Sequence, residues 1–340
     1  MSAALDPAAD RGGPAQPMLI AEGLKKHFRI AGGGAVRAVD GISFSVAKGE
    51  TLGVVGESGC GKSTLARLLL HLIEPDAGAL VFDGEAVGAP DGIKLRDLRR
   101  QAQMVFQDSA SSLNPRMPVR DSVAFGPRAL GRGGAEAARM ADETLRRVGL
   151  DPVQFGPRYP HELSGGQKQR VNIARALALE PRLIILDEAV SALDKSVEAQ
   201  VLNLLARLKQ QFGLTYVFIS HDLAVVQHVS DRVLVMYLGW VVESGPAHEV
   251  FRAPLHPYTH ALLASRLSMD PDHRVEQAPI TGDPPSPANP PSGCRFRTRC
   301  PQAEAVCAAV VPENGGQTGH QAMCHMLVPG SGHSAARVAA

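Results

Sequence analysis

The sequence has no run of 18 or more apolar residues, so no segment is expected to span a membrane. It also lacks a basic excess, with 35 basic and 34 acidic residues, and so gives no reason to expect nucleic-acid binding. The first sixteen residues have no apolar core of a signal peptide, and residues 1–17 are expected to be a disordered tail. The 340 residues, 44% hydrophobic and 20% charged, are typical of a globular protein with more than one domain.

The strongest motif is a glycine-rich loop at residues 56–63, Gly-Glu-Ser-Gly-Cys-Gly-Lys-Ser, which fills every fixed position of the phosphate-binding loop. A short apolar run precedes it, and leucines follow at the spacing of one helix face. This context predicts a strand, a loop and a helix N-terminus that aim backbone N–H groups at an anion. Lys62 is predicted to reach the β- and γ-phosphates of a nucleotide, and the Ser63 hydroxyl to bind Mg²⁺.

Neighbouring residues of the loop are predicted to contact the nucleotide or to leave room for it. The set comprises Gly56, Ser58, Gly59, Cys60, Gly61 and Thr64. Cys60 is interpreted as a small spacer, whose pKa a nearby helix N-terminus could lower. Phe28 lies in a predicted strand, where its ring either stacks on a nucleotide base or belongs to the core.

Patterns around this loop predict an α/β domain over residues 18–265. Alternating residues and turn signals predict a small antiparallel sheet within 18–55, and the region 118–180 is expected to be a helical subdomain. Residues 163–167 read Leu-Ser-Gly-Gly-Gln, in which Ser164 is a good N-cap for a second helix N-terminus that could face an anion.

Two acidic residues close a predicted central strand. Four aliphatic residues at 183–186 suit a strand buried on both faces of a parallel sheet, and Asp187 and Glu188 follow them. Because α/β sheets bind ligands at the carboxyl ends of their strands, both carboxylates are expected at the mouth of the site. A further strand at 216–219 delivers His221 to the same edge.

The sequence changes character after residue 265. Prolines crowd residues 279–291, which predicts a stiff linker or arm within an extension over 266–328, followed by a disordered tail at 329–340. Four of the five cysteines lie in this extension at spacings x5, x6 and x16: Cys294, Cys300, Cys307 and Cys324. The spacing matches neither paired zinc motifs nor ferredoxin motifs. Four thiolates favour a soft metal, and scattered core thiols are the alternative.

Taken in order, the motifs resemble those of the ATP-binding subunit of an ABC transporter over about residues 18–266. The matching motifs are the phosphate loop 56–63, the Q-loop Gln107, the signature 163–167, the Walker B strand 183–187 with Glu188, the D-loop 191–194 and the switch histidine His221. The resemblance implies a P-loop ABC-type nucleotide-binding domain of the α/β class. Its expected parts are a mixed sheet core, an antiparallel β subdomain, a helical subdomain and a small C-terminal Cys-rich extension.

The resemblance also implies ATP hydrolysis. Ser63, Gln107 and Asp187 would hold Mg²⁺, Glu188 would act as the general base on water, and His221 would contact the γ-phosphate. The implied catalytic residues are Lys62, Gln107, Glu188 and His221. Because two such domains sandwich ATP in this family, the signature residues would act on ATP held by the opposite subunit. They are Ser164, Gly165, Gly166 and Gln167.

Further segments resemble the oligopeptide/dipeptide importer group, which includes nickel importers. These segments are 104–108, 112–116, 256–259 and 284–301. The resemblance makes a [4Fe–4S] cluster the preferred ligand of the four cysteines, with Zn²⁺ second.

The implied function is the ATPase of a di- or oligopeptide importer, peripheral on the cytoplasmic face of the inner membrane. Its expected partners are a second, similar ATPase subunit in a heterodimer, two integral membrane permease subunits and, indirectly, an extracytoplasmic substrate-binding protein. No nucleic acid is expected. Import of nickel or another small solute is one alternative, and a non-transport ABC ATPase is the other.

Overall fold

The computed structural model describes residues 16–30, 32–108, 111–265 and 282–336. The first fifteen residues, residues 266–281 of the expected extension and residues 337–340 of the expected tail lie outside the described residues. Among the described helices, none combines the length and the apolar character needed to cross a membrane.

The main sheet is mixed and has the strand order β11-β12-β10-β9-β3-β8-β7-β6. Its parallel part comprises β3 (Thr51–Val55), β6 (Ala102–Val105), β7 (Leu183–Asp187), β8 (Thr215–Ile219) and β9 (Arg232–Tyr237). Every residue of β3, β7 and β8 is buried, as expected of aliphatic strands covered on both faces. The antiparallel part comprises β10 (Trp240–Pro246), β11 (Asn314–Gln317) and β12 (His320–Met323).

A second, antiparallel sheet has the order β2-β1-β4-β5. Its strands are β1 (Pro17–Arg29), β2 (Ala35–Ala47), β4 (Ala77–Phe82) and β5 (Glu85–Ala86). The apolar face of helix α1 (Lys62–Leu69) belongs to one hydrophobic cluster with residues of both sheets, including Leu19 and Ile185. The helix that starts at the phosphate loop is therefore anchored between the two sheets.

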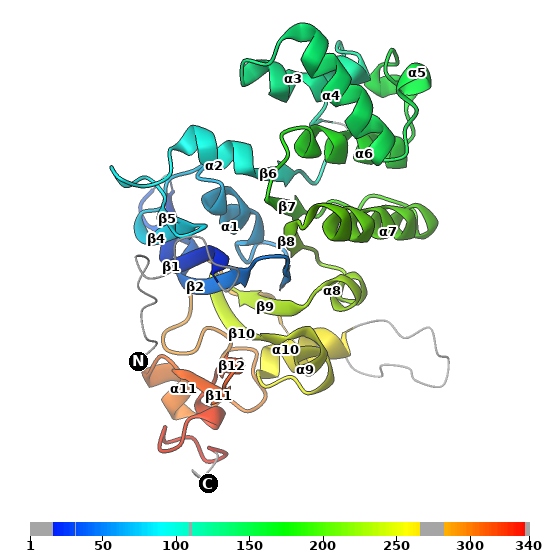
Figure 1. The fold of residues 1–340 in the computed structure, drawn as a ribbon. Helices are drawn as coiled ribbons and strands as arrows, with labels where there is room; N and C mark the ends of the chain where they lie inside the picture. Colours follow the sequence, from blue (N-terminus) through cyan, green and yellow to red (C-terminus); the bar gives the residue numbers. More distant parts are fainter. Residues whose placement is uncertain (1–15, 31, 109–110, 266–281, 337–340) are drawn as a thin grey trace.

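The remaining helices lie around and beyond the main sheet (Figure 1). They are α2 (Leu95–Gln101), α3 (Val119–Ala129), α4 (Gly134–Arg147), α5 (Pro152–Phe155), η1 (Pro160–Glu162), α6 (Gly165–Leu177), α7 (Lys195–Phe212), α8 (Leu223–Val229), α9 (Ala247–Arg252), α10 (Pro257–Ala264), α11 (Ala305–Ala309) and η2 (His325–Leu327). Helices α3 to α6 form a separate group at the top of Figure 1. The predicted fold class, with a mixed sheet core, an antiparallel subdomain and a helical subdomain, is confirmed.

The described part of the C-terminal extension, residues 282–336, is attached to the main sheet. Strand β12 pairs with β10 through Glu243 and Ala322, so the extension lengthens the sheet, which the sequence did not predict. Residues 329–336 were expected to be disordered, but His333 is buried and its Nε2 lies 2.9 Å from the Gln302 carbonyl oxygen. The extension therefore includes these residues.

Candidate active site

The phosphate loop joins β3 to α1, and close backbone packing explains the glycines at 56 and 61. At Gly61 φ is +110°, and an added Cβ would lie 1.9 Å from the Ala38 carbonyl oxygen. Lys62 is buried, and its Nζ donates to the carbonyl oxygens of Gly56 (2.8 Å) and Glu57 (3.0 Å). The backbone thus fits tightly around the lysine, at the positive end of α1.

Beside this loop lies a cavity of about 620 Å³. The predicted residues that line it are Phe28, Ser58, Gly59, Gly61, Lys62, Ser63, Thr64, Gln107, Glu188 and His221. Val36 and Ala38 of β2 also line it, and no sequence signal marked them. Phe28 is 41% exposed, which fits a ring open to a base better than a core residue. The cavity joins residues that are up to 193 positions apart in the sequence, since 28 and 221 both face it.

Two of the three predicted Mg²⁺ ligands, Ser63 and Asp187, are hydrogen-bonded to each other, and Ser63 lines this cavity. Ser63 Oγ donates a 3.2 Å hydrogen bond to Asp187 Oδ1. Burial raises the pKa of the Asp187 carboxyl group above its ordinary value, while the Ser63 hydrogen bond opposes this shift. A hydroxyl and a buried carboxylate are oxygen donors of the kind that Mg²⁺ prefers, so these residues fit the ion.

Glu188 lies at the centre of the predicted catalytic residues. Its backbone is in the left-handed region (φ 48°), which is uncommon for a residue with a side chain. Glu188 Oε2 accepts a 2.8 Å hydrogen bond from Gln107 Nε2 and lies 3.4 Å from His221 Nδ1. One carboxylate oxygen is therefore shared by residues from two other segments, in a position to accept a proton.

The signature residues form a regular helix start on α6. Ser164 Oγ accepts from the Gln167 N–H (3.4 Å), and Gln167 Oε1 accepts from the Ser164 N–H (3.0 Å), which forms a capping box. Ser164, Gly165, Gly166 and Gln167 are not among the described residues that line the 620 Å³ cavity. Within one chain, the structure does not bring them to the phosphate loop.

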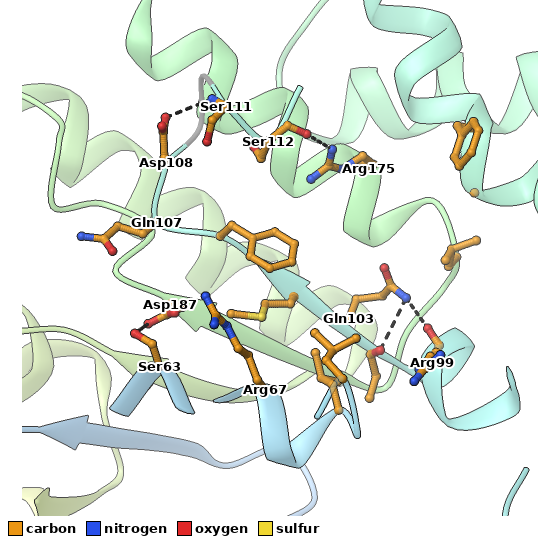
Figure 2. A pocket seen from close by; sticks show the side chains of 18 residues that line it. Ser63, Arg67, Arg99, Gln103, Gln107, Asp108, Ser111, Ser112, Arg175 and Asp187 are labelled. Atoms are coloured by element: carbon orange, nitrogen blue, oxygen red, sulfur yellow. Dashed lines mark hydrogen bonds between the residues drawn. The ribbon is translucent and has the colours of Figure 1, made fainter. Parts of the chain in front are cut away.

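A groove of about 730 Å³ runs between the main sheet and the helical subdomain, beside Gln107 (Figure 2). Two partly exposed aromatic residues line it, Phe106 (38%) and Phe125 (61%). Figure 2 shows the Ser63–Asp187 hydrogen bond at one edge of the groove and Arg175 bonded to Ser112 at another. The groove thus extends to Ser63 and Asp187, two of the predicted Mg²⁺ ligands.

The four cysteines of the extension line one small cavity of about 20 Å³. Burial raises the pKa of Cys294 and of Cys324 to about 11. No set of three or more metal-binding side chains converges among the described residues. The thiols line one cavity without forming such a set, so the described part of the chain does not show the expected iron–sulfur or zinc site.

The fifth cysteine also differs from its expectation. Cys60 is buried, with Sγ 3.8 Å from Lys62 Nζ, and burial raises rather than lowers the pKa of its thiol. Its role as a compact spacer suits this packing.

Comparison with known families finds two matching regions. Residues 39–191 match the ABC transporter family, and residues 242–307 match the oligopeptide/dipeptide transporter C-terminal region. The first range contains the phosphate loop, the signature and the strand ending in Asp187. The second begins in β10 and includes three of the four cysteines of the extension.

Individual proteins agree with these matches. The oligopeptide transport ATP-binding protein AppF of Bacillus subtilis is 49% identical over 319 residues, covering 89% of this chain and 95% of the relative. The solved structure of cbiO1 from Clostridium perfringens, part of the ABC transporter complex cbiONQ, has a TM-score of 0.61 and 31% identity, with 70% of this chain and 91% of that chain covered. The ATP-binding cassette MJ0796, solved as a dimer bound to ADP and Pi, has a TM-score of 0.60 and 28% identity, covering 68% of this chain and 99% of that chain.

Proposed function

Because this chain belongs to the ABC transporter family and carries the C-terminal region of its oligopeptide/dipeptide group, we propose that it drives the import of di- or oligopeptides. The chain is the ATP-hydrolysing subunit, which works with membrane permease components. The observation that carries the catalytic assignment is the shared Glu188 oxygen, 2.8 Å from Gln107 and 3.4 Å from His221 beside the phosphate loop. The name of the Bacillus relative supports the peptide substrate.

In the proposed reaction, the loop N–H groups and Lys62 hold the β- and γ-phosphates, and Phe28 stacks on the base. Ser63, Asp187 and Gln107 would hold Mg²⁺, which would supply charge neutralisation at the transferred phosphoryl group. Glu188 accepts a proton from the attacking water. His221 contacts the γ-phosphate. Gln107 lines both the nucleotide cavity and the 730 Å³ groove, and so links the presence of that phosphate to the groove.

We further propose that the working unit is a heterodimer of two ATPase subunits. Ser164 is the N-cap of α6 and Gly166 lies in its first turn. Neither lines the chain's own nucleotide cavity, and both would reach ATP bound by the partner subunit. The dimeric ADP-bound structure of the related cassette MJ0796 supports this arrangement.

The 730 Å³ groove is the proposed docking site for a permease subunit. Its exposed Phe106 and Phe125 side chains suit an apolar partner segment, and Gln107 joins it to the catalytic site. Docking there would place the chain on the cytoplasmic face of the inner membrane, with substrate received from an extracytoplasmic binding protein.

The catalytic proposal is tested with Glu188→Gln, which keeps the size of the side chain and removes the basic carboxylate. ATP turnover is expected to fall by roughly 10²–10⁴-fold because the general base is lost, while MgATP binding is retained. Steady-state turnover and equilibrium ATP binding are measured on the same preparation, with Glu85→Gln on β5 as a surface control. Unchanged turnover would reject Glu188 as the base.

The substrate proposal is tested in a strain that carries the complete transporter. Labelled di- and oligopeptide uptake is expected to be lost in the Glu188→Gln strain. Uptake of nickel instead of peptides would favour the small-solute alternative of the same family.

Metal binding by the extension is retained as a proposal on one observation, the four thiols around one cavity. Elemental analysis and a visible spectrum of anaerobically purified protein test it. Iron with broad visible absorption supports a cluster, and one zinc per chain supports the second expectation. Absence of both metals would reject metal binding.

A further inference from the structure

The C-terminal extension contacts the phosphate loop directly. Arg299 donates from Nη1 to Glu57 Oε2 (2.8 Å) and from Nη2 to Glu57 Oε1 (3.0 Å), a bidentate ion pair. The Arg299 side chain is 6% exposed and the Glu57 side chain 24% exposed, so the pair is largely shielded from water. The hydrogen bonds to Glu57 raise the pKa of Arg299, which therefore stays charged.

Glu57 is the second residue of the loop and is fixed through all of its polar groups. Its N–H donates to the Tyr258 hydroxyl oxygen (2.9 Å), and Tyr258 is fully buried in α10. Its carbonyl oxygen accepts from Lys62 Nζ (3.0 Å) and from the Cys60 N–H (3.3 Å). Displacing Glu57 would therefore displace the lysine that is proposed to bind the phosphates.

A second arginine of the extension reaches the other side of the loop. Arg295 is buried, lies over the Trp240 ring (3.9 Å from its guanidinium carbon to the centroid), and donates to the Leu238 carbonyl oxygen. The next residue, Gly239, donates its N–H to the Cys60 carbonyl oxygen (2.9 Å). The extension thus supports the loop near Glu57 directly and near Cys60 through the β9–β10 turn.

We propose that Arg299 is a positioning residue for nucleotide binding, through which the C-terminal extension holds the phosphate loop in its binding conformation. Arg299 acts through Glu57 and does not itself touch the nucleotide. It also neutralises the charge of the Glu57 carboxylate, which belongs to the phosphate loop. The inference rests on the assignment of residues 56–63 as the ATP site.

The test compares MgATP binding by the full-length chain and four variants: Arg299→Gln, Arg299→Lys, Glu57→Gln and the double variant Arg299→Gln/Glu57→Gln. Arg299→Gln is expected to raise the Kd for MgATP about tenfold, because Glu57 becomes unpaired. Arg299→Lys keeps the charge but not the bidentate geometry. Its Kd is expected to lie between that of wild type and that of Arg299→Gln. In the Glu57→Gln background, Arg299→Gln should change the Kd much less, since the two residues form a coupled pair.

The matched control is Arg297→Gln, a change of the same charge in the same segment. Arg297 donates to Ser292 within the extension and not to the phosphate loop. The Kd of the Arg297→Gln variant for MgATP is expected to match that of wild type. The number of binding sites per chain separates positioning from stability, because a folding defect lowers that number and leaves the Kd of the folded fraction unchanged.

An unchanged Kd in Arg299→Gln, or equal effects of Arg299→Gln in both Glu57 backgrounds, would overturn the proposal. Failure of the wild-type chain to bind MgATP would instead overturn the assignment of the ATP site.

Discussion

The parallel core and the C-terminal extension are held in place by different forces. In the core, strands β3, β7 and β8 carry buried and mostly apolar side chains, and backbone pairing joins them. The extension has only a small described apolar cluster of its own, Ala322, Cys324 and Leu327. Besides the β10–β12 pairing and the burial of Phe296 in the main core, its attachment relies on polar contacts such as Glu243–His320 and Arg299–Glu57.

This difference matters for the site. Hydrophobic burial is non-directional and fixes where the strands lie, whereas a bidentate ion pair also fixes the orientation of the groups that it joins. The core therefore brings Asp187 and Glu188 to the sheet edge, and the extension adjusts the loop that faces them. Substitutions in the core should therefore lower the stability of the whole protein, and substitutions in the extension should mainly weaken MgATP binding.

The largest effect is expected from a core truncation. Ile185→Ala removes a fully buried side chain from β7 and should lower the free energy of unfolding by about 2–5 kcal/mol, because a cavity remains. Ile185→Val is the control and should cost about 0.5–1.5 kcal/mol. Denaturant unfolding measures both values, and similar small losses for the two variants would mean that the core tolerates voids and the comparison fails.

The sequence predicted those parts of the molecule in which neighbouring residues carry the information. The phosphate loop and the strand 183–187 are local patterns, and both occupy the expected elements. The capping box of Ser164 likewise depends on residues three positions apart. Local residues determine these geometries, so a single sequence is sufficient to predict them.

Long-range polar contacts were not predictable in this way. Glu57 and Arg299 are 242 positions apart, and neither residue type is unusual in its own segment. The pairing of β12 with β10 depends equally on distant residues. The left-handed backbone of Glu188 is also set by its surroundings, since its N–H donates to the Ile219 carbonyl oxygen on the neighbouring strand.

A smaller effect is expected where β12 joins the core sheet. His320→Ala removes the partner 2.8 Å from Glu243 Oε1, a carboxylate that is fully buried. Glu243 keeps hydrogen bonds from the N–H groups of Leu255 and His256. The free energy of unfolding is therefore expected to fall by only about 2 kcal/mol. Hydrogen exchange should show faster exchange in β11 and β12 and unchanged exchange in β7.

His320→Gln is the control for this variant, because its amide can still donate to Glu243. It should retain most of the protection of β11 and β12. Equal acceleration in β7 would show that the extension and the core unfold together, contrary to the comparison.

The smallest effect concerns pH and involves His256, which lies where the two regions meet. Its Nδ1 accepts a 3.0 Å hydrogen bond from the Tyr258 N–H at the start of α10, and burial lowers its pKa from 6.5 to about 4. The unfolded chain therefore binds a proton below pH 6.5 that the folded chain refuses until about pH 4. Stability should decrease as the pH falls through this window, by about 1–2 kcal/mol between pH 7 and pH 5.

His256→Asn separates this titration from the packing, since its side-chain oxygen can still accept the Tyr258 N–H at the N-cap. The free energy of unfolding is measured in urea at pH 7 and at pH 5. It should fall less for the variant than for wild type, because the variant lacks the group that binds one extra proton on unfolding. Because the Tyr258 hydroxyl also accepts from the Glu57 N–H, protonation of His256 in the folded chain, near pH 4, should weaken MgATP binding by wild type and leave the variant unaffected. Identical pH dependence of wild type and variant would mean that His256 is accessible to water when folded, and that the boundary between core and extension is less tightly packed than its burial indicates.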